Sequence, residues 1–324
     1  MRKLLLIALA LNFVACSTDN NESASTASAQ VTKSVFNPNP TPEDYKLSKD
    51  PNYVRDEKTI AELKKGSATG KTAAVWVNTY VPDANFRLAL INAGAGQEDA
   101  VANDSYINID KTRVGLYVAG ANIADATGIQ AFTSLQQLII SGNQLSSLNV
   151  SAITTLSWLE CQNNLLTTLN LSSNVNLTQI WCHSNQLTSL TIPSNVAGLW
   201  GLWCYGNQLT TLNLNGNTKL TSLFIQSNQL TSLNLAPLTV LGMTNVSSNK
   251  WTTLNFDSNS QLTALWCFGN TLLTDLSIKN NNNFAITLQD FTQNTKRPKI
   301  HVDANFLSQA YTKWPASGGS VYQL

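Results

Sequence analysis

Histidine and charged side chains are scarce in this chain of 324 residues. It has two histidines, and Asp, Glu, Lys and Arg together make up 12% of the residues, with 20 basic against 19 acidic side chains. Nucleic-acid-binding domains carry a basic face of Lys and Arg, so this balance excludes nucleic acid as a partner. Neither His183 nor His301 has a metal-ligand or Ser/His/Asp spacing around it, so we expect no enzyme activity, no metal site and no cofactor.

Long hydrophobic runs are absent except at the N-terminus. Met1-Arg2-Lys3 precedes an apolar run that ends at Ala15, a pattern typical of a secretory signal and too short for a spanning helix. Phe13-Val14-Ala15-Cys16 then resembles a bacterial lipobox, with Phe13 where leucine is usual. We therefore expect residues 1–15 to be a signal peptide and Cys16 to carry the lipid that holds the protein on a membrane. The alternative is an ordinary signal peptide with a cysteine near its cleavage site.

Residues 16–74 have little from which to build a core. A Ser/Ala/Thr-rich run follows Cys16 as far as about Gln30, and an Asn-Pro-Asn-Pro-Thr-Pro stretch comes soon after. This composition predicts a flexible linker. Within it, residues 66–72 have glycines like those of a phosphate-binding loop, but with one residue too few between them and after a charged helix candidate. We interpret this stretch as a flexible turn in preference to a phosphate site.

Asparagine recurs at a nearly fixed interval between residues 143 and 270. Successive members lie 21, 21, 22, 21, 21 and 21 residues apart, each with an apolar residue or cysteine three positions earlier. Leu199-x-x-Leu202-x-Cys204-x-x-Asn207-x-Leu209 shows the full unit, which matches the leucine-rich-repeat consensus. The asparagine is expected to hydrogen-bond backbone groups that the coil leaves unpaired, which is a structural role. The recurring residues are Asn143, Asn164, Asn185, Asn207, Asn228, Asn249 and Asn270.

A second L-x-x-L-x-L unit follows in each repeat, as in Leu209-x-x-Leu212-x-Leu214, so both sides of the coil are expected to be extended. From about Val114 to Asn280, this doubled 21-residue repeat with cysteine in its first strand resembles the repeats of internalin-like and Bacteroidetes leucine-rich-repeat proteins. Acidic residues soon after Cys16 also resemble the surface-export signals of Bacteroidetes lipoproteins. The resemblance implies an outer-membrane lipoprotein at the cell surface whose partner is an extracellular or host protein.

The fold class that follows is an α/β-type repeat solenoid that is mostly β. It is predicted to be a curved parallel β stack of leucine-rich repeats with N- and C-terminal caps, whose coils are about 4.8 Å apart. Helix starts are expected at Val81-Pro82-Asp83 and in the segment Val302–Pro315. The predicted parts are 75–134 for the N-terminal cap and a degenerate first repeat, 135–283 for the repeats, and 284–324 for the C-terminal cap.

Four cysteines occupy one inward repeat position, where the other coils have Ile140, Ile225 and Val246. Free cysteine behaves as a small buried hydrophobe, so we predict a ladder of reduced thiols in the core in preference to a metal site. A disulfide in an oxidising compartment is the other alternative, although in-register side chains rarely give the required dihedral angle. The four residues are Cys161, Cys182, Cys204 and Cys267.

The residue between the two inward positions of each first strand is expected to point outward. These residues are unusually aromatic, whereas the equivalent residues of the second strands are small and polar: Asn149, Asn170, Thr191, Asn213, Asn234 and Asn255. Exposed rings are typical of a binding face, but they could also form a cross-strand ladder that stiffens the stack by about 0.2–1 kcal/mol a pair. The row reads Tyr117, Ile139, Glu160, Trp181, Trp203, Phe224, Asn245 and Trp266, and a neighbouring row contains His183, Tyr205 and Phe268.

The function predicted from these features is binding. We expect a monomeric, non-catalytic cell-surface protein, an adhesin or protein-interaction module, whose ligand-binding face consists of Tyr117, Ile139, Trp181, His183, Trp203, Tyr205, Phe224, Trp266 and Phe268. The alternative is a glycan-binding surface lipoprotein, because three tryptophans recur with almost no charge nearby. A purely structural envelope protein would need no such row. Coplanar exposed rings on a flat platform would favour a glycan, and a cleft flanked by loops would favour a peptide or protein.

Overall fold

The computed structural model describes residues 73–99, 101, 104–194, 198–314 and 320–324. The expected signal peptide, Cys16 and the predicted linker as far as residue 72 lie outside the described residues. Within the described ranges, no helix is long and apolar enough to cross a membrane.

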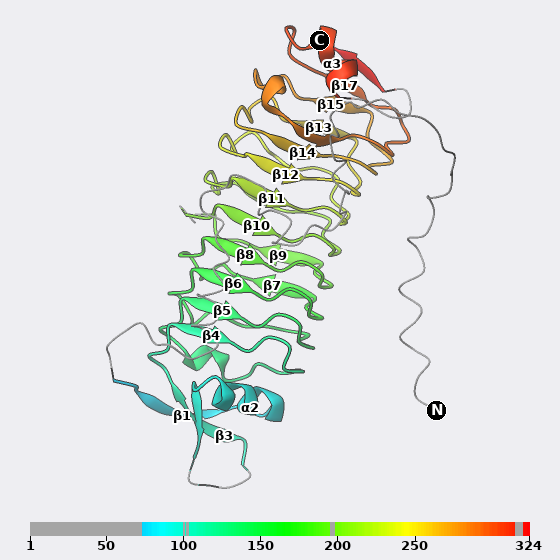
Figure 1. The fold of residues 1–324 in the computed structure, drawn as a ribbon. Coiled ribbons are helices and arrows are strands. Elements are labelled where there is room, and N and C mark those ends of the chain that lie inside the picture. The colour runs from blue at the N-terminus through cyan, green and yellow to red at the C-terminus, as the bar shows by residue number, and fades with distance from the viewer. Residues whose placement is uncertain (1–72, 100, 102–103, 195–197, 315–319) are drawn as a thin grey trace, which may run out of the picture. The chain divides into compact units, whose positions relative to one another are not determined.

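The repeats form a leucine-rich-repeat solenoid that is mostly β, as predicted. Nine short strands pair in parallel in a single sheet, here called the front sheet (Figure 1). Equivalent repeat residues lie opposite one another, so that Leu202 pairs with Ile180 on one side and Leu223 on the other. The strands are β4 (Gly115–Tyr117), β5 (Gln137–Ile139), β6 (Trp158–Glu160), β8 (Gln179–Trp181), β10 (Gly201–Trp203), β11 (Ser222–Phe224), β12 (Met243–Asn245), β14 (Ala264–Trp266) and β16 (Leu288–Asp290).

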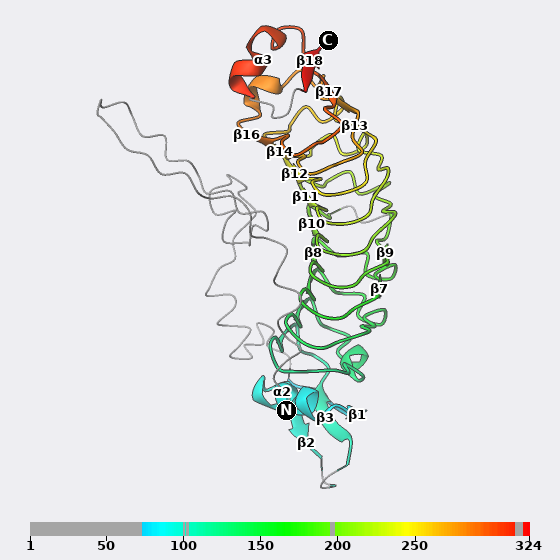
Figure 2. The ribbon, with the colours of Figure 1, turned by 90° about the vertical axis from the view of Figure 1, so that its right-hand side faces the viewer.

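The second strands lie on the opposite side of the coils (Figure 2). β7 (Thr168–Asn170) pairs with β9 (Ser189–Thr191), and a further parallel sheet contains β13 (Thr253–Asn255), β15 (Asp275–Ser277), β17 (Lys299–His301) and β18 (Val321–Gln323). In the three coils around Val150, Leu214 and Leu235, this side has no assigned strand. Both sides of the coil were expected to be extended, but the second side has paired strands in only part of the stack.

Each repeat asparagine joins two coils from inside the turn. The Nδ2 of Asn207 donates to the carbonyl oxygens of Cys204, at 2.9 Å, and Cys182, at 3.1 Å. Its Oδ1 accepts the backbone N–H of Leu187 at 2.9 Å. Asn164, Asn185 and Asn228 repeat this pattern. The N–H of Leu187 would otherwise be buried without a partner, and each carbonyl between two coils accepts from the asparagines of both, which confirms the structural role predicted for these residues.

The stack continues for one coil beyond Asn283, where the sequence analysis expected the repeats to end. β16 pairs with β14, and β17 pairs with β15. Asn294 takes the repeat asparagine's place, because its Nδ2 donates to the carbonyls of Phe291, at 2.8 Å, and Cys267, at 2.9 Å. This coil escaped detection because Asn294 follows Asn270 by 24 residues instead of 21, with phenylalanine at the inward position before it.

The N-terminal end of the stack is a small α/β unit. β1 (Trp76–Tyr80), β3 (Tyr106–Asp110) and β2 (Gly96–Glu98) form an antiparallel sheet in that order, with α2 (Ala84–Asn92) beside it. Asp83 begins α2 as predicted, since one carboxylate oxygen accepts the N–H of Phe86 at 2.9 Å. Its other oxygen accepts the N–H of Ala124 at 2.8 Å, which joins the helix start to the first repeat.

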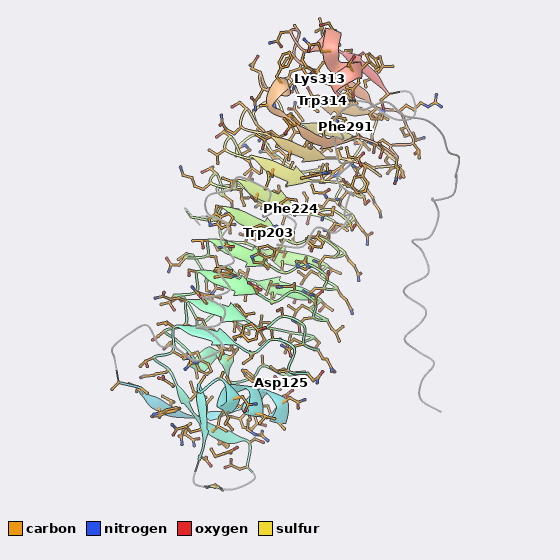
Figure 3. The ribbon with its side chains drawn as sticks, viewed as in Figure 1. Asp125, Trp203, Phe224, Phe291, Lys313 and Trp314 are labelled. Atoms are coloured by element: carbon orange, nitrogen blue, oxygen red, sulfur yellow. The ribbon has the colours of Figure 1, made fainter. Side chains whose placement is uncertain are left out.

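The C-terminal end is built around tryptophan. The predicted helix is present as α3 (Leu307–Lys313), and Trp314 directly after it is buried with its ring centroid 4.4 Å from that of Phe306 and 5.7 Å from that of Phe291 (Figure 3). The indole Nε1 donates to the carbonyl of Ile286 at 3.2 Å. Trp314 therefore attaches this end of the chain to the last coils. Two further short helical turns are η2 (Ile129–Ala131) and η3 (Asn283–Ala285).

Candidate functional site

The outward side of the front sheet carries the residues predicted to bind a partner. In β10, Leu202 and the following Cys204 belong to the hydrophobic core, whereas Trp203 lies outside that core on the other side of the sheet. Trp203 pairs with Trp181 of β8 and with Phe224 of β11, so these residues form a row across successive coils (Figure 3). We call this set the aromatic row: Tyr117, Ile139, Trp181, Trp203, Phe224 and Trp266.

Rings in the aromatic row stack face to face along the solenoid. The centroids of Trp181 and Trp203 lie 3.7 Å apart with an interplanar angle of 4°, and those of Trp203 and Phe224 lie 6.2 Å apart at 2°. In the neighbouring row, His183 stacks on Tyr205 at 4.2 Å and 6°. These rings are parallel and stacked, and do not lie in one plane as a flat platform would require. Trp266 departs from the stack, because its ring is tilted by 40° to that of Phe224, with centroids 6.3 Å apart.

Solvent reaches little of the middle of the row. Trp181 and Trp203 each expose 2% of their surface and Phe224 exposes none, whereas Tyr117 and Trp266 towards the two ends are half-buried. The rings were predicted to be exposed, and this prediction fails in the middle of the row because strand alternation gives the side of the sheet and not the contacts made on that side. A sugar that stacks on an aromatic side chain needs an open ring face, and the stacked pair of Trp181 and Trp203 does not present one between its members.

Gly201 determines where the indole of Trp203 lies, and the sequence analysis did not single it out. A Cβ at this position would lie 2.3 Å from Cζ3 and 2.4 Å from Cη2 of Trp203, so the ring crosses the space that any other side chain would occupy. Trp200 contacts the same ring edge to face, with centroids 5.9 Å apart at 89°. The signal in the sequence was a lone glycine at a position where the adjacent coils have Gln179 and Ser222.

Several buried polar atoms beside the aromatic row have no hydrogen-bond partner. They are the indole Nε1 of Trp203, the Oε1 of Gln179 and both amide atoms of Gln226. Gln179 lies on β8 opposite Gly201, and Gln226 lies two residues after Phe224. Most buried polar groups in folded proteins are satisfied, and leaving one unpaired costs about 1–3 kcal/mol. These atoms have almost no exposed surface and lack the hydrogen bond that a buried polar group normally makes.

A buried carboxylate interrupts the row. Glu160 lies between Ile139 and Trp181 in the register and exposes 3% of its surface. Its two oxygens accept the indole Nε1 of Trp158 at 3.1 Å and the Nε2 of Gln162 at 3.2 Å. The only acidic side chain of this predicted row is thus held by neutral donors two residues before and two residues after it.

The two histidines lie on different sheets. Burial lowers the pKa of His183 to about 4, so it is neutral near pH 7, and its Nδ1 lies 3.2 Å from the Oγ of Ser184. His301 lies on β17, with its Nε2 3.1 Å from the Oδ2 of Asp275. Among the described residues, no group of three or more His, Cys, Asp and Glu side chains could hold a metal ion.

The opposite face of the solenoid is polar, exposed and satisfied by its own backbone. The outward residues of the second strands are all exposed, as predicted. Most are asparagines whose Oδ1 accepts the N–H two residues ahead, as Asn213 does from Asn215 at 3.0 Å. Thr191 is the exception, and the residue two positions after it is Pro193, which has no N–H to donate. The asparagines on this face therefore stabilise turns.

The cysteines line the inside of the front sheet in the predicted positions. Cys161, Cys182 and Cys204 follow one another in successive coils, and with Cys267 they are fully buried and free. Burial raises the pKa of Cys161, Cys204 and Cys267 to about 12, and it also raises the pKa of Cys182. The thiols are therefore protonated and poor nucleophiles at neutral pH.

No protein-family model matches this chain, and no curated protein matches it. Among solved structures, the chain is similar to the functional domain of InlJ from Listeria monocytogenes, which includes a cysteine ladder, at 20% identity over 75% of this chain and 81% of that one, with a TM-score of 0.31. It is also similar to internalin C2 of the same organism, at 19% identity over 68% of this chain and 99% of that one, with a TM-score of 0.46. A third similar structure is the leucine-rich-repeat protein LIC12759 of Leptospira interrogans, at 20% identity over 61% of this chain and 50% of that one, with a TM-score of 0.43. At these values, the similarity assigns no function.

Proposed function

We propose that this protein is a non-catalytic binding module whose partner is another protein, held on the outward side of the front sheet. One observation carries the proposal: the aromatic row coincides with buried polar atoms that lack partners, at Gln179, Trp203 and Gln226. Binding hot spots combine large aromatic side chains with hydrogen bonds shielded from water. The outward residues of the second strands are small, polar and exposed instead.

The chemistry of these groups favours a protein over a glycan. A glutamine amide donates and accepts at once, so Gln226 complements a backbone peptide group of a partner strand or loop. A sugar would use an open ring face, whereas Trp203 has Trp181 on one side and Phe224 on the other. The ring edges that remain carry positive charge density, which suits carbonyl oxygens and the faces of other aromatic side chains.

The proposed role also includes a place for the protein, on the surface of a bacterial outer membrane, as an adhesin anchored by lipid on Cys16. The residues concerned lie outside the described part, and the proposal rests on the signal-like start and the lipobox-like Phe13-Val14-Ala15-Cys16. Cys16→Ser is expected to release the protein from the membrane fraction and to abolish labelling with a fatty-acid analogue. Unchanged labelling and fractionation of this variant would contradict the anchor.

Loss of the indoles should abolish binding. We expect the full-length chain to bind a protein on an array of extracellular proteins and glycans. A variant with Trp181, Trp203 and Trp266 changed to alanine should lose at least about a hundredfold in affinity for that protein, because one hot-spot residue contributes at least about 2 kcal/mol. The matched control changes Thr168, Thr191 and Thr253, exposed on the opposite face, to alanine. Equal binding by all three proteins would place the site elsewhere.

A second pair of variants separates the site from the stability of the fold. Gly201→Ala keeps every ring but displaces the indole of Trp203, whereas Gly198→Ala meets only Cγ2 of Thr178, at the ordinary contact distance of 3.6 Å. We expect Gly201→Ala to weaken binding and to lose the ultraviolet circular dichroism couplet of the stacked indoles, and Gly198→Ala to change neither. If Gly201→Ala loses the couplet but binds normally, the aromatic row is a structural ladder. A glycan that displaces the bound protein from the parent chain would favour a glycan as the ligand.

A further inference from the structure

The outer edge of the N-terminal sheet is an exposed and apolar strand. β1 lies at one edge of the order β1-β3-β2 (Figure 1). Trp76 exposes 38%, Val77 36% and Tyr80 48% of its surface, and Tyr106 beside it exposes 43%. Apolar side chains are therefore exposed on both faces of this strand, which differs from the buried strands of the front sheet.

No strand among the described residues pairs with the outer edge of β1, and its backbone offers hydrogen bonds there. The carbonyl of Val75 accepts the N–H of Lys111 at 3.1 Å, and the N–H of Val81 donates to the carbonyl of Ser105 at 2.7 Å. In an antiparallel pair, hydrogen-bonded positions alternate, so the odd-numbered residues of β1 bond to β3. The N–H and C=O groups of Trp76, Asn78 and Tyr80 therefore point away from the sheet.

Nothing in the sequence of this strand prevents it from pairing. Edge strands in soluble proteins are usually protected by charged side chains, proline or a bulge. From Ala73 to Tyr80 the chain has no charged residue and no proline, and β1 pairs with β3 over five consecutive residues without a bulge. Valine, threonine and aromatic residues are those that favour strands.

We propose that β1 pairs antiparallel with β1 of a second copy of this chain, about a two-fold axis at Asn78. Asn78 would lie opposite Asn78 of the second copy, and Trp76 opposite Tyr80 of the second copy, so that the outward-pointing N–H and C=O groups of all three residues are satisfied. The two three-stranded sheets would become one of six strands.

The strand fits itself in this register, which is why a second copy is the partner proposed. Trp76 and Tyr80 form an aromatic pair on one face, and Val77 lies opposite Thr79 of the second copy on the other, with no like charges opposed. The same surface serves both copies, as a closed two-fold interface requires. This pairing replaces the monomer expected from the sequence and is independent of the function proposed for the front sheet.

Cross-linking tests the register. Cα atoms of a hydrogen-bonded antiparallel pair lie about 5.5 Å apart, within reach of a disulfide, so the full-length Asn78→Cys variant should form a linked dimer on mild oxidation. Val77→Cys is the matched control, since the two copies of residue 77 would lie diagonally about 7–8 Å apart, beyond that reach. The unchanged chain controls for Cys16, because its other four cysteines are buried. Equal cross-linking of the two variants would contradict the register.

Proline variants test the association itself. Proline at 78 removes an N–H that faces away from β3, together with the exposed hydrogen bond from Nδ2 of Asn78 to Asp99. No bond to β3 is lost, so Asn78→Pro should fold and stay monomeric, whereas Thr79→Pro removes a bond to β3 and should unfold this end of the molecule. A single strand pair is a small interface, so we expect the mass of the unchanged chain in sedimentation to rise towards that of a dimer between about 1 and 100 µM. A chain that stays monomeric throughout, with no Asn78→Cys cross-link, overturns the proposal.

Discussion

Asn207→Ala is expected to lower the free energy of unfolding by about 2–6 kcal/mol. The substitution leaves the buried N–H of Leu187 without a partner, at a cost of about 1–3 kcal/mol. It also removes one hydrogen bond from each of the carbonyls of Cys182 and Cys204, worth about 0.5–1.5 kcal/mol apiece, although each carbonyl keeps a second asparagine donor. Asn207 lies inside the turn, so water does not replace it. The damage lies at the centre of the stack, where each coil depends on both of its neighbours.

A second asparagine of the same coil provides the control. Asn213 is exposed and accepts one hydrogen bond, from the N–H of Asn215. Asn213→Ala should therefore lower the free energy of unfolding by about 1 kcal/mol or less, because water can replace an exposed bond. Urea unfolding of both variants measures the difference. Equal losses would mean that the inward asparagines do not hold the coils together.

The solenoid could be predicted because each coil buries the same side chains and makes the same asparagine hydrogen bonds. Leucine, cysteine and asparagine recur at positions fixed by the coil, so a period of 21 residues was sufficient to give the strands, the inward residues and the role of Asn207. Where one coil changes length, that signal is lost, as with Asn294. A change of residue type within a coil of ordinary length also hides contacts from the sequence. Trp251 occupies the position of Leu209 and Leu230, is fully buried and donates its Nε1 to the carbonyl of Val246 at 2.7 Å.

The candidate site could be predicted only in part. Strand alternation placed Trp181, Trp203 and Phe224 on one side of the sheet, and the structure places them there. Their burial depends on rotamers and on contacts between coils, which no periodicity encodes. The role of Gly201 follows from the path of one indole ring, and the unpaired amide of Gln226 from the absence of a suitable neighbour. Such features are visible only when the side chains are placed together.

Alkaline solution is expected to unfold this protein steeply through its cysteines. Burial raises the pKa of Cys161, Cys204 and Cys267 from the ordinary 9.0 to about 12, and raises that of Cys182. Below pH 9 both states keep these protons, and the thiols do not affect stability. Between pH 9 and 12 only the unfolded chain releases them, so the free energy of unfolding should fall by about 5 kcal/mol per pH unit. With a typical stability of about 5–15 kcal/mol, unfolding should be complete within a few pH units above 9.

Replacing three of the thiols identifies the source of this slope. The equivalent position in other coils holds Ile140, Ile225 or Val246, so changing Cys161, Cys182 and Cys204 together to valine should preserve the fold. One of the four thiols then remains, and the slope between pH 9 and 12 should fall to about 1.4 kcal/mol per pH unit. Burial also raises the pKa of Tyr322, so Tyr322→Phe should remove a smaller contribution above pH 10. If the triple variant keeps the full slope, the thiols of the folded protein titrate at ordinary pH and are not sealed in the core. Iodoacetamide would then alkylate the native parent without unfolding, and the valine variant, which lacks three of these thiols, would be alkylated less.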